Sequence, residues 1–192
     1  MENFNSKKYW ENRYSKKGNS GLGSYGLESE FKSSFLNKFI EDNNIKNITD
    51  LGCGDGNQIS QLYSFEKYYG YDVSKTVINI CNDKFNGVDK LSFHNDYNSL
   101  PISDLTMSLD VTYHIIEDSY FNEYMKMLFD KSSKYVILYT INSSDSTGFA
   151  QHLKNREIKT WIEKNIYDFQ FKSYSKYSGK SNGIGFFIYE KK

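Results

Sequence analysis

The chain has 192 residues, with 24 basic and 24 acidic side chains and a hydrophobic fraction of 38%. That length fits one domain with a sizeable core, and the balanced charge disfavours a dedicated nucleic-acid binder, which needs a basic face to neutralise phosphates. No apolar run approaches the roughly 20 residues of a membrane span, and the N-terminus lacks the order of a signal peptide. With two cysteines that make no disulfide framework, the composition predicts a single-domain cytoplasmic protein over residues 1–192, without nucleic-acid or membrane partners.

The first half of the chain alternates short apolar runs with segments of helical periodicity. Residues 1–26 are polar, with glycines and aromatics interleaved, and we assign no helix or strand to them. From Leu27 to about Asp42, apolar residues recur at helical spacing. Strands are predicted at Asn47–Leu51, Tyr68–Asp72 and Leu91–His94, a helix opening at Asn57–Tyr63, and a helix at Ser74–Phe85. Ser74 is placed to cap that last helix, because its hydroxyl can accept from a free backbone N–H.

The second half continues the alternation and closes with two strands. Strands are predicted at Asp104–Val111 and Lys134–Thr140, helices at Tyr120–Phe129 and Gln151–Ile166, and closing strands near Asp168–Tyr174 and Gly185–Glu190. The closing strands can pair as a hairpin across residues 178–183. This order predicts an α/β fold, here a Rossmann-like, doubly wound, mostly parallel seven-stranded sheet with an antiparallel C-terminal strand. Such sheets bind ligands beyond the carboxyl ends of their strands.

The strongest chemical signal is the sequence Asp50-Leu51-Gly52-Cys53-Gly54-Asp55-Gly56 at the end of the first strand. Three glycines at alternate positions let the backbone turn sharply and approach a ligand without Cβ clashes. Asp72 stands twenty residues beyond Gly52, at the end of the next strand, where a carboxylate can accept both hydroxyls of a ribose. The alternative, a plain tight turn with Asp72 capping a helix, requires two separate features to coincide. The combination therefore favours a nucleoside site.

The glycine spacing bears on which nucleoside binds. Dinucleotide sites favour G-x-G-x-x-G, where a helix N-terminus holds a pyrophosphate, whereas this chain has G-x-G-x-G. The chain is also short for a dehydrogenase, and its Tyr-x-x-x-Lys matches at Tyr63/Lys67 and Tyr71/Lys75 lie around the second strand, before the place where that chemistry sits. S-adenosylmethionine (SAM) has no phosphate and presents an amino acid beside the turn. SAM is therefore favoured over NAD.

Several segments resemble motifs of the class I SAM-dependent methyltransferases. Residues 50–56 resemble motif I, Asp72 the acid of motif II, His94-Asn95-Asp96 motif III, and residues 109–114 motif IV with its following segment. The resemblance covers residues 47–140 and implies SAM as cofactor, S-adenosylhomocysteine (SAH) as product, and an approach of Asp96 to the adenine amino group. It implies cofactor contacts from Gly52, Cys53, Gly54, Asp72, Val73, Asp96 and Asp110. The departure from motif I is Asp55, which stands where a small residue is usual, although related enzymes tolerate polar residues there.

The N-terminal residues resemble a narrower group. Residues 9–14 and 21–26 are similar to bacterial methyltransferases of this size, and the similarity implies that Tyr9 and Tyr25 close over the cofactor. Such proteins often accompany enzymes of cell-surface sugar synthesis, which implies a role in polysaccharide biosynthesis. We expect residues 1–30 to form a lid whose aromatic rings favour the sulfonium charge. The alternative is a segment that packs on the sheet edge.

The predicted chemistry lies after the strand at Asp104–Val111. Methyl transfer from a sulfonium is an in-line displacement, and an alcohol acceptor gains from a base that removes its proton. His114 is the candidate base because its intrinsic pKa suits proton transfer near neutral pH; the alternative is a histidine that bonds loop backbone or packs beside SAM. Asp110 is a candidate for orienting this region or the amino group of SAM. The alternative is an aspartate at a strand end that caps a turn. Tyr113 is a candidate substrate contact.

His152 and Arg156 are the other candidate substrate contacts. They stand four apart in the predicted helix Gln151–Ile166 and would share one face of it. The guanidinium of Arg156 would suit a carboxylate or phosphate on the acceptor, and a surface arginine on a solvent-facing helix is the alternative. We expect residues 141–160 to form the acceptor-side segment. No grouping of Asp, Asn or His shows metal-ligand spacing, so no metal is expected.

These features predict a SAM-dependent methyltransferase acting on a small molecule, at a hydroxyl of a sugar or of a phosphorylated or carboxylated metabolite. The main alternative is a SAM-binding regulatory or scaffold domain without turnover. Nucleic-acid enzymes that use an Asn/Asp-Pro-Pro loop or a Pro-Cys nucleophile are excluded, because Pro101 is the only proline. RNA enzymes that lack both features stay open, as do the acceptor, the choice between oxygen and nitrogen, and the oligomeric state.

Overall fold

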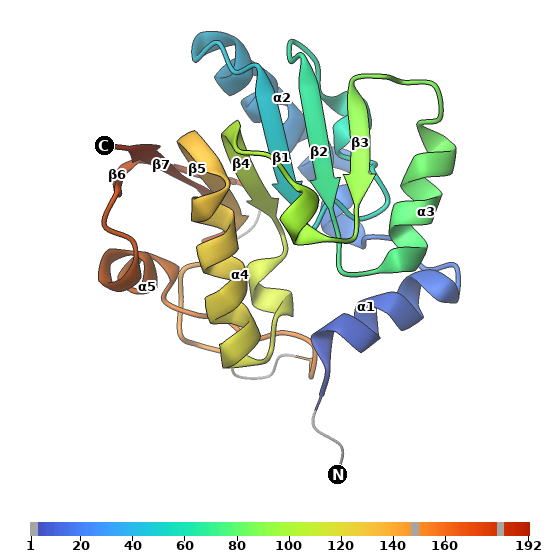
Figure 1. Cartoon of the computed structure of the whole chain (residues 1–192). Helices are drawn as coiled ribbons and strands as arrows, with labels where there is room; N and C mark the ends of the chain where they lie inside the picture. The colour runs from blue at the N-terminus through green and yellow to red at the C-terminus, as the bar shows by residue number, and fades with distance from the viewer. Residues whose placement is uncertain (1–3, 147–149, 180–182) are drawn as a thin grey trace.

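The computed structural model describes residues 4–146, 150–179 and 183–192. At its centre lies a seven-stranded sheet in the order β3-β2-β1-β4-β5-β7-β6 (Figure 1). The strands are β1 (Asn47–Leu51), β2 (Lys67–Tyr71), β3 (Leu91–His94), β4 (Ser103–Leu109), β5 (Ser132–Thr140), β6 (Phe169–Lys176) and β7 (Gly185–Lys191). β1 to β5 run parallel, and β7 runs antiparallel between β5 and β6. The predicted fold class is confirmed.

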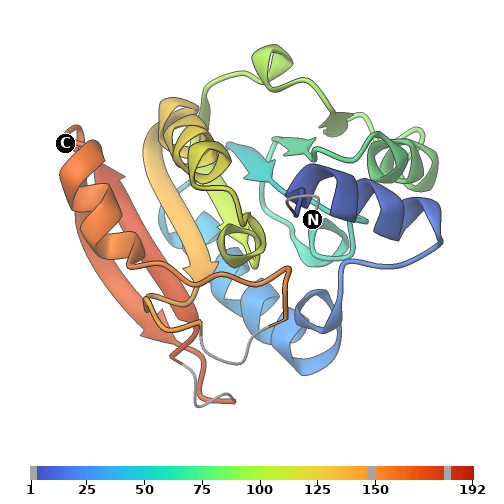
Figure 2. The same cartoon turned by 90° about the horizontal axis from the view of Figure 1, so that it is seen from below.

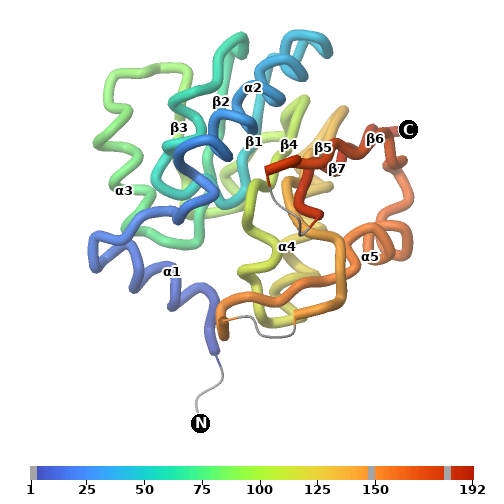
Figure 3. Tube along the Cα trace, turned by 180° about the vertical axis from the view of Figure 1, so that it is seen from behind, coloured from blue at the N-terminus to red at the C-terminus, as the bar shows by residue number. Residues whose placement is uncertain are grey.

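Helices cover both faces of the sheet. They are α1 (Ser6–Ser15), α2 (Gly26–Asp42), α3 (Lys75–Lys84), α4 (Asp118–Asp130) and α5 (Ile158–Asn165). Residues of α2 and α3 pack on one face and those of α4 and α5 on the other, while α1 lies beyond the carboxyl ends of the strands (Figures 1 and 3). Ser74 caps α3 as expected, since its Oγ accepts from the Val77 amide at 3.2 Å. Within the described residues, no helix has the length and apolar character to cross a bilayer.

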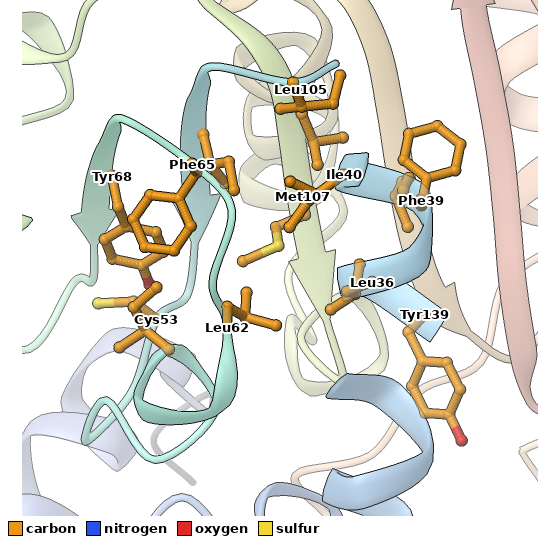
Figure 4. Close-up of a cluster of buried hydrophobic side chains, with 14 of the residues drawn as sticks. Leu36, Phe39, Ile40, Cys53, Leu62, Phe65, Tyr68, Leu105, Met107 and Tyr139 are labelled. Atoms are coloured by element: carbon orange, nitrogen blue, oxygen red, sulfur yellow. The ribbon is translucent and has the colours of Figure 1, made fainter. Parts of the chain in front are cut away.

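Two apolar clusters, one on each face, hold the helices against the sheet. The first is shown in Figure 4, where Leu36 and Ile40 of α2 lie in the same cluster as Met107 of β4. The second joins α4 and α5 to the opposite face. β5 contributes Ile137 and Tyr139 to the first cluster and Val136 and Leu138 to the second, because successive residues of a strand point to opposite faces. A strand buried on both faces is continuously apolar, as the run at Lys134–Thr140 predicted.

Two segments in the first half differ from the expectation. Residues 6–15 form α1, where no helix is predicted; Asn5 caps it by accepting from the Lys8 amide at 2.8 Å, and its contacts to other elements replace an apolar stripe. The helix expected to open at Asn57–Tyr63 is a single 3₁₀ turn, Ile59–Gln61. Gln58 and Gln61 turn their side-chain amides to serines of α2 instead of continuing a helix.

The helix predicted at Gln151–Ile166 is wrong in its first half, because α5 begins at Ile158. The Lys154 amide donates to the Tyr113 carbonyl at 2.8 Å and the Asn155 amide to Ser146 Oγ at 2.7 Å. Both bonds use donors that a helix would direct to its own carbonyls. His152 and Arg156 therefore share no helix face. Parts of the predicted lid (1–3), of the acceptor-side segment (147–149) and of the closing turn (180–182) lie outside the described residues.

Candidate functional site

A pocket lies at the carboxyl ends of β1, β2 and β4, and α1 crosses this end of the sheet (Figure 2). Its empty space of ≈ 820 Å³ includes solvent at the mouth, so the pocket is open to the outside. The strand ends line it with Asp50, Gly52, Gly54, Asp72, Asp110 and His114, and α1 with Ser6, Trp10 and Tyr14. The ligand position expected from the sheet topology is thus a real cavity.

The turn after β1 requires glycine for two reasons. Gly52 has φ +86° and Gly54 has φ +54°, conformations that strain any other residue. A Cβ would also collide with Val111 at Gly52 and with the Ser20 hydroxyl at Gly54. The amides of Gly52 and Cys53 donate to the Tyr71 carbonyl at 2.7 and 3.0 Å, which ties the turn to the end of β2. The turn therefore brings bare main chain to the pocket wall.

Two buried acids stand beside this turn. Asp72 accepts from the Gly54 amide through Oδ2 (3.2 Å) and from the Ser74 amide through Oδ1 (2.9 Å), and burial raises the pKa of its carboxyl to about 6. Asp50 accepts from the Tyr68 hydroxyl at 2.8 Å through Oδ2, while its Oδ1 has no hydrogen-bond partner among the described residues. Burial raises the pKa of Asp50 to about 7. Such a buried, unpaired oxygen is costly unless a ligand supplies a donor.

His114 lines the pocket after the end of β4, in the 3₁₀ turn Thr112–His114. Its Nδ1 lies 3.2 Å from the His152 carbonyl oxygen, so Nδ1 carries the proton, and the lone pair of Nε2 has no partner among the described residues. Burial lowers the pKa of His114 to about 4. The ring lies edge-on to Trp10 and stacks on His152, with centroid distances of 5.0 and 5.6 Å. His114 is therefore a neutral, oriented imidazole at physiological pH.

An ion pair lies beside His114 on the pocket wall. Asp110 accepts from Lys32 Nζ at 2.5 Å and from the Tyr113 hydroxyl at 2.6 Å, and it adopts a φ of 62° that is uncommon for a residue with a side chain. Lys32 comes from α2 and is only 1% exposed. Buried charges are paired in this way because an unpaired one loses its hydration without compensation. Asp110 therefore faces the pocket as part of a salt bridge.

Three side chains of α1 spaced four apart, Ser6, Trp10 and Tyr14, cover the pocket. The helix is fastened at its start by Ser6, whose amide and hydroxyl donate to Glu117 at 2.9 and 2.6 Å. Glu11 accepts from the Ser74 hydroxyl at 2.7 Å and fastens the middle of the helix to α3. α1 thus forms a fixed roof over the cavity.

The other residues expected at the site occupy different places. Cys53 and Val73 line the pocket, whereas Tyr9 stacks on His152 with a centroid distance of 5.0 Å and Tyr25 donates to Asp55 at 2.7 Å. Asp96 caps the turn Tyr97–Ser99 by accepting from the Asn98 amide at 3.0 Å. Tyr9, Tyr25, Asp96, Tyr113, His152 and Arg156 are not among the residues that line the cavity.

The guanidinium of Arg156 is bound by other residues of the protein. It donates to the carbonyls of Ile115 (2.7 Å) and Ile116 (3.0 Å), pairs with Asp118 at 2.8 Å, and lies over the ring of Phe121. All these partners belong to the segment between β4 and α4 or to α4 itself. Arg156 therefore holds this segment in place from the outside.

Sequence reasoning places Trp10 and Tyr14 in an aromatic lid, but it missed that residues 6–15 form a helix, and it missed Ser6 and Lys32. The spacing of Ser6, Trp10 and Tyr14 carries a signal, since residues four apart share a helix face. Lys32 lies four residues before Leu36 and eight before Ile40, in the buried stripe of α2. A lysine in an apolar stripe indicates a buried partner, although the sequence does not tell which one.

The comparisons agree with this geometry. Residues 49–130 match the family model described as "Methyltransferase domain", and no curated protein matches the chain. Magnesium protoporphyrin IX methyltransferase of Synechocystis PCC 6803 with bound SAM is similar with TM-score 0.72 and 16% identity, over 98% of each chain. The N-methyltransferase NodS of Bradyrhizobium japonicum WM9 with SAH has TM-score 0.76 and 13% identity, over 98% of this chain and 99% of that one. The methyltransferase domain of bacterial CtHen1 has TM-score 0.68 and 20% identity, over 86% of this chain and 99% of that one.

Residues 49–130 match a methyltransferase domain, and the fold is similar to that of solved methyltransferases with bound SAM or SAH; both findings support methyl transfer with SAM as the cofactor. The residues present fit that cofactor. The unpaired Oδ1 of Asp50 suits its ammonium group, the open lone pairs of Asp72 suit ribose hydroxyls, and the glycine turn leaves room for the chain that joins them.

Proposed function

We propose that this chain transfers a methyl group from SAM to a hydroxyl of a small-molecule acceptor. The observation that carries the proposal is the presence in one pocket of a buried acid suited to a ribose and of a neutral histidine with a free ring nitrogen. Bound SAM supplies a methyl group on a sulfonium sulfur. Aligning that group with the acceptor oxygen can contribute about 7–11 kcal/mol to lowering the barrier.

Each group has a stated task in this proposal. Asp72 accepts from the ribose hydroxyls, and Asp50 accepts from the cofactor ammonium. Nε2 of His114 accepts the proton of the acceptor hydroxyl, and the bond from Nδ1 to the His152 carbonyl fixes the ring for that step. α1 excludes water as the roof of the site, as the predicted lid requires, and His152 supports the His114 ring without lining the pocket.

A small acceptor is supported by the roofed pocket and by the balanced charge of 24 basic against 24 acidic side chains. The competing acceptor is RNA, because one of the solved structures with a similar fold is described as small RNA methyltransferase HEN1. Phosphate or carboxylate on the acceptor gains no support from Arg156, since that guanidinium is paired with Asp118. A neutral hydroxylic acceptor is therefore preferred.

Acceptors are sought by a coupled assay for SAH release. Sugars, nucleotide sugars, phosphosugars, acidic metabolites and a small RNA would be offered separately, with Asp72→Ala as the control without cofactor. Sugars head the panel because the N-terminal resemblance implies cell-surface sugar synthesis. Release with at least one small molecule and none with RNA is expected. Release with RNA alone, or SAH binding with no turnover on any acceptor, would contradict the proposal, the second result favouring a regulatory domain.

His114→Ala is expected to lower kcat about 100-fold with the best acceptor and to leave the Kd for SAH within about twofold. General-base catalysis is worth roughly 10²–10⁴-fold, and the low pKa of His114 places it at the weak end of that range. The matched control is His94→Ala, a histidine of β3 that does not line the pocket. An equal loss of kcat in the His114→Ala and His94→Ala variants would show that His114 is not the general base.

The affinity for SAH is expected to fall as the pH drops below about 7, by up to about tenfold per pH unit at first and by up to about 100-fold per unit below about 6, where a second carboxyl also takes up a proton. The raised pKa of Asp72, about 6, means that its carboxyl takes up a proton there and accepts hydroxyl donors less well. Asp50, with a pKa of about 7, contributes in the same direction at higher pH. Calorimetric titrations between pH 5 and 8 measure the effect. Asp72→Asn should remove the part centred near pH 6, and a flat wild-type profile would speak against the assignment.

A further inference from the structure

Asp55, the residue that departs from motif I, fastens a distant segment to the glycine turn. Its Oδ2 accepts from the Ser20 amide at 2.9 Å and from the Tyr25 hydroxyl at 2.7 Å. Its own amide donates back to Ser20 Oγ at 2.9 Å. Ser20 and Tyr25 belong to the loop between α1 and α2, 35 and 30 residues earlier in the chain. The contact is therefore tertiary and reciprocal.

The surroundings of Asp55 complete this attachment. Ser20 Oγ lies 3.1 Å from the Tyr14 hydroxyl on the roof helix, and Asn57 Nδ2 donates to the Ser24 carbonyl at 2.6 Å. Gly54 permits the close approach, since a Cβ there would collide with Ser20 Oγ. Tyr14, Ser20 and Ser24 all line the pocket. The loop thus closes one side of the pocket, and its place depends on the glycine turn.

A local turn does not account for a carboxylate at this position. Asp55 Oδ1 accepts from the Asn57 amide at 3.2 Å, a bond that an asparagine oxygen makes equally well. The second oxygen is the one that reaches the loop, and it accepts two donors at once. Only a carboxylate offers acceptors on both sides. Burial, with the bond to Asp55, raises the pKa of Tyr25 to about 12, so the phenol remains a donor at neutral pH.

We propose that Asp55 is a positioning residue that holds the segment Ser20–Tyr25 closed over the cofactor and thereby sets how fast the cofactor leaves. The proposal rests on the proposed function, because it takes SAM and SAH as the occupants of the pocket. In this role Asp55 affects how long the cofactor is retained. It makes no contact with the acceptor. Opening of the segment breaks the bonds of Oδ2, and a cofactor can escape only from the opened state.

The test measures SAH dissociation by stopped-flow fluorescence, with Trp10 in the pocket as the probe and Trp161→Phe as the background that isolates its signal. Asp55→Ala is expected to raise the dissociation rate about tenfold, comparable to the loss of one hydrogen bond to a charged group. Asp55→Asn should lie between Asp55→Ala and wild type, because it keeps one acceptor. Tyr25→Phe should raise the rate about threefold, and should have no further effect once Asp55 is alanine. Asp89→Ala, an exposed acid remote from the pocket, should behave as wild type.

Two results would overturn this inference and leave the proposed function standing. One is a dissociation rate for Asp55→Ala within twofold of wild type, and the other is an equal effect of Tyr25→Phe in both backgrounds. Thermal melting of each variant shows that the chains compared are folded, and Tyr25→Phe supplies the test should Asp55→Ala not fold. A wild-type chain that binds no SAH would overturn the proposed function together with this inference.

Discussion

Asp72→Ala is expected to lower the affinity for SAH about 1,000-fold while the fold persists. Two ribose hydroxyls donating to a carboxylate are worth about 1.5–3 kcal/mol each, which together correspond to roughly 10²–10⁴-fold in Kd. Loss of the side chain leaves the Gly54 and Ser74 amides without an acceptor. It also removes a buried carboxylate whose raised pKa marks a desolvation cost. The two effects on stability oppose each other, so the variant should melt within a few degrees of wild type.

Calorimetry with SAH measures this loss, and Asp83→Ala is the matched control, since Asp83 is an exposed acid on α3. Asp72→Asn should recover part of the affinity because its amide oxygen still accepts from one hydroxyl. A Kd for Asp72→Ala within tenfold of wild type would mean that the ribose lies elsewhere.

Gly52→Ala is expected to lower the stability by about 2–5 kcal/mol and the melting temperature by about 10 °C, with a large loss of SAH affinity. A left-handed conformation costs a residue with a Cβ about 1–2 kcal/mol, and overpacking against Val111 adds about 1–3 kcal/mol. Val111 lines the pocket, so its displacement also disturbs the site.

Gly87→Ala separates the backbone contribution to this loss of stability from the contribution of overpacking. Gly87 also has a positive φ, +80°, but a Cβ there meets nothing within 4 Å. Thermal melting should therefore show only the backbone term, about 1–2 kcal/mol, and unchanged SAH affinity. Equal destabilisation at both positions would show that the close approach of the turn to Val111 contributes nothing.

The parts of the fold that could be predicted are those that local pattern determines. β1 and β3 have the predicted bounds, because short apolar runs end at sharp polar or glycine signals. α1 could not be predicted, since its stability comes from contacts such as Ser6 with Glu117, across more than a hundred residues. The stretch 151–157 belongs to a predicted helix, yet the backbone amides of Lys154 and Asn155 bond to other segments. Tertiary bonding overrode local preference in both places.

The site, too, could be predicted only in part. The meeting of the glycine turn and Asp72 was predictable, because they form a motif of fixed spacing, and the structure brings both to one cavity. The acceptor side was not, because its arrangement depends on where distant side chains meet. Lys32 reaches Asp110 from α2, and Arg156 turns to Asp118 although its sequence position suggested the cleft.

The most direct test of the account is a crystal structure of the chain with SAH. In that structure we expect the ribose hydroxyls on Asp72, the amino group at Oδ1 of Asp50, and the sulfur facing His114 across the pocket. An adenosyl group bound away from the turn at Gly52 and Gly54, or a sulfur that points away from His114, would contradict it.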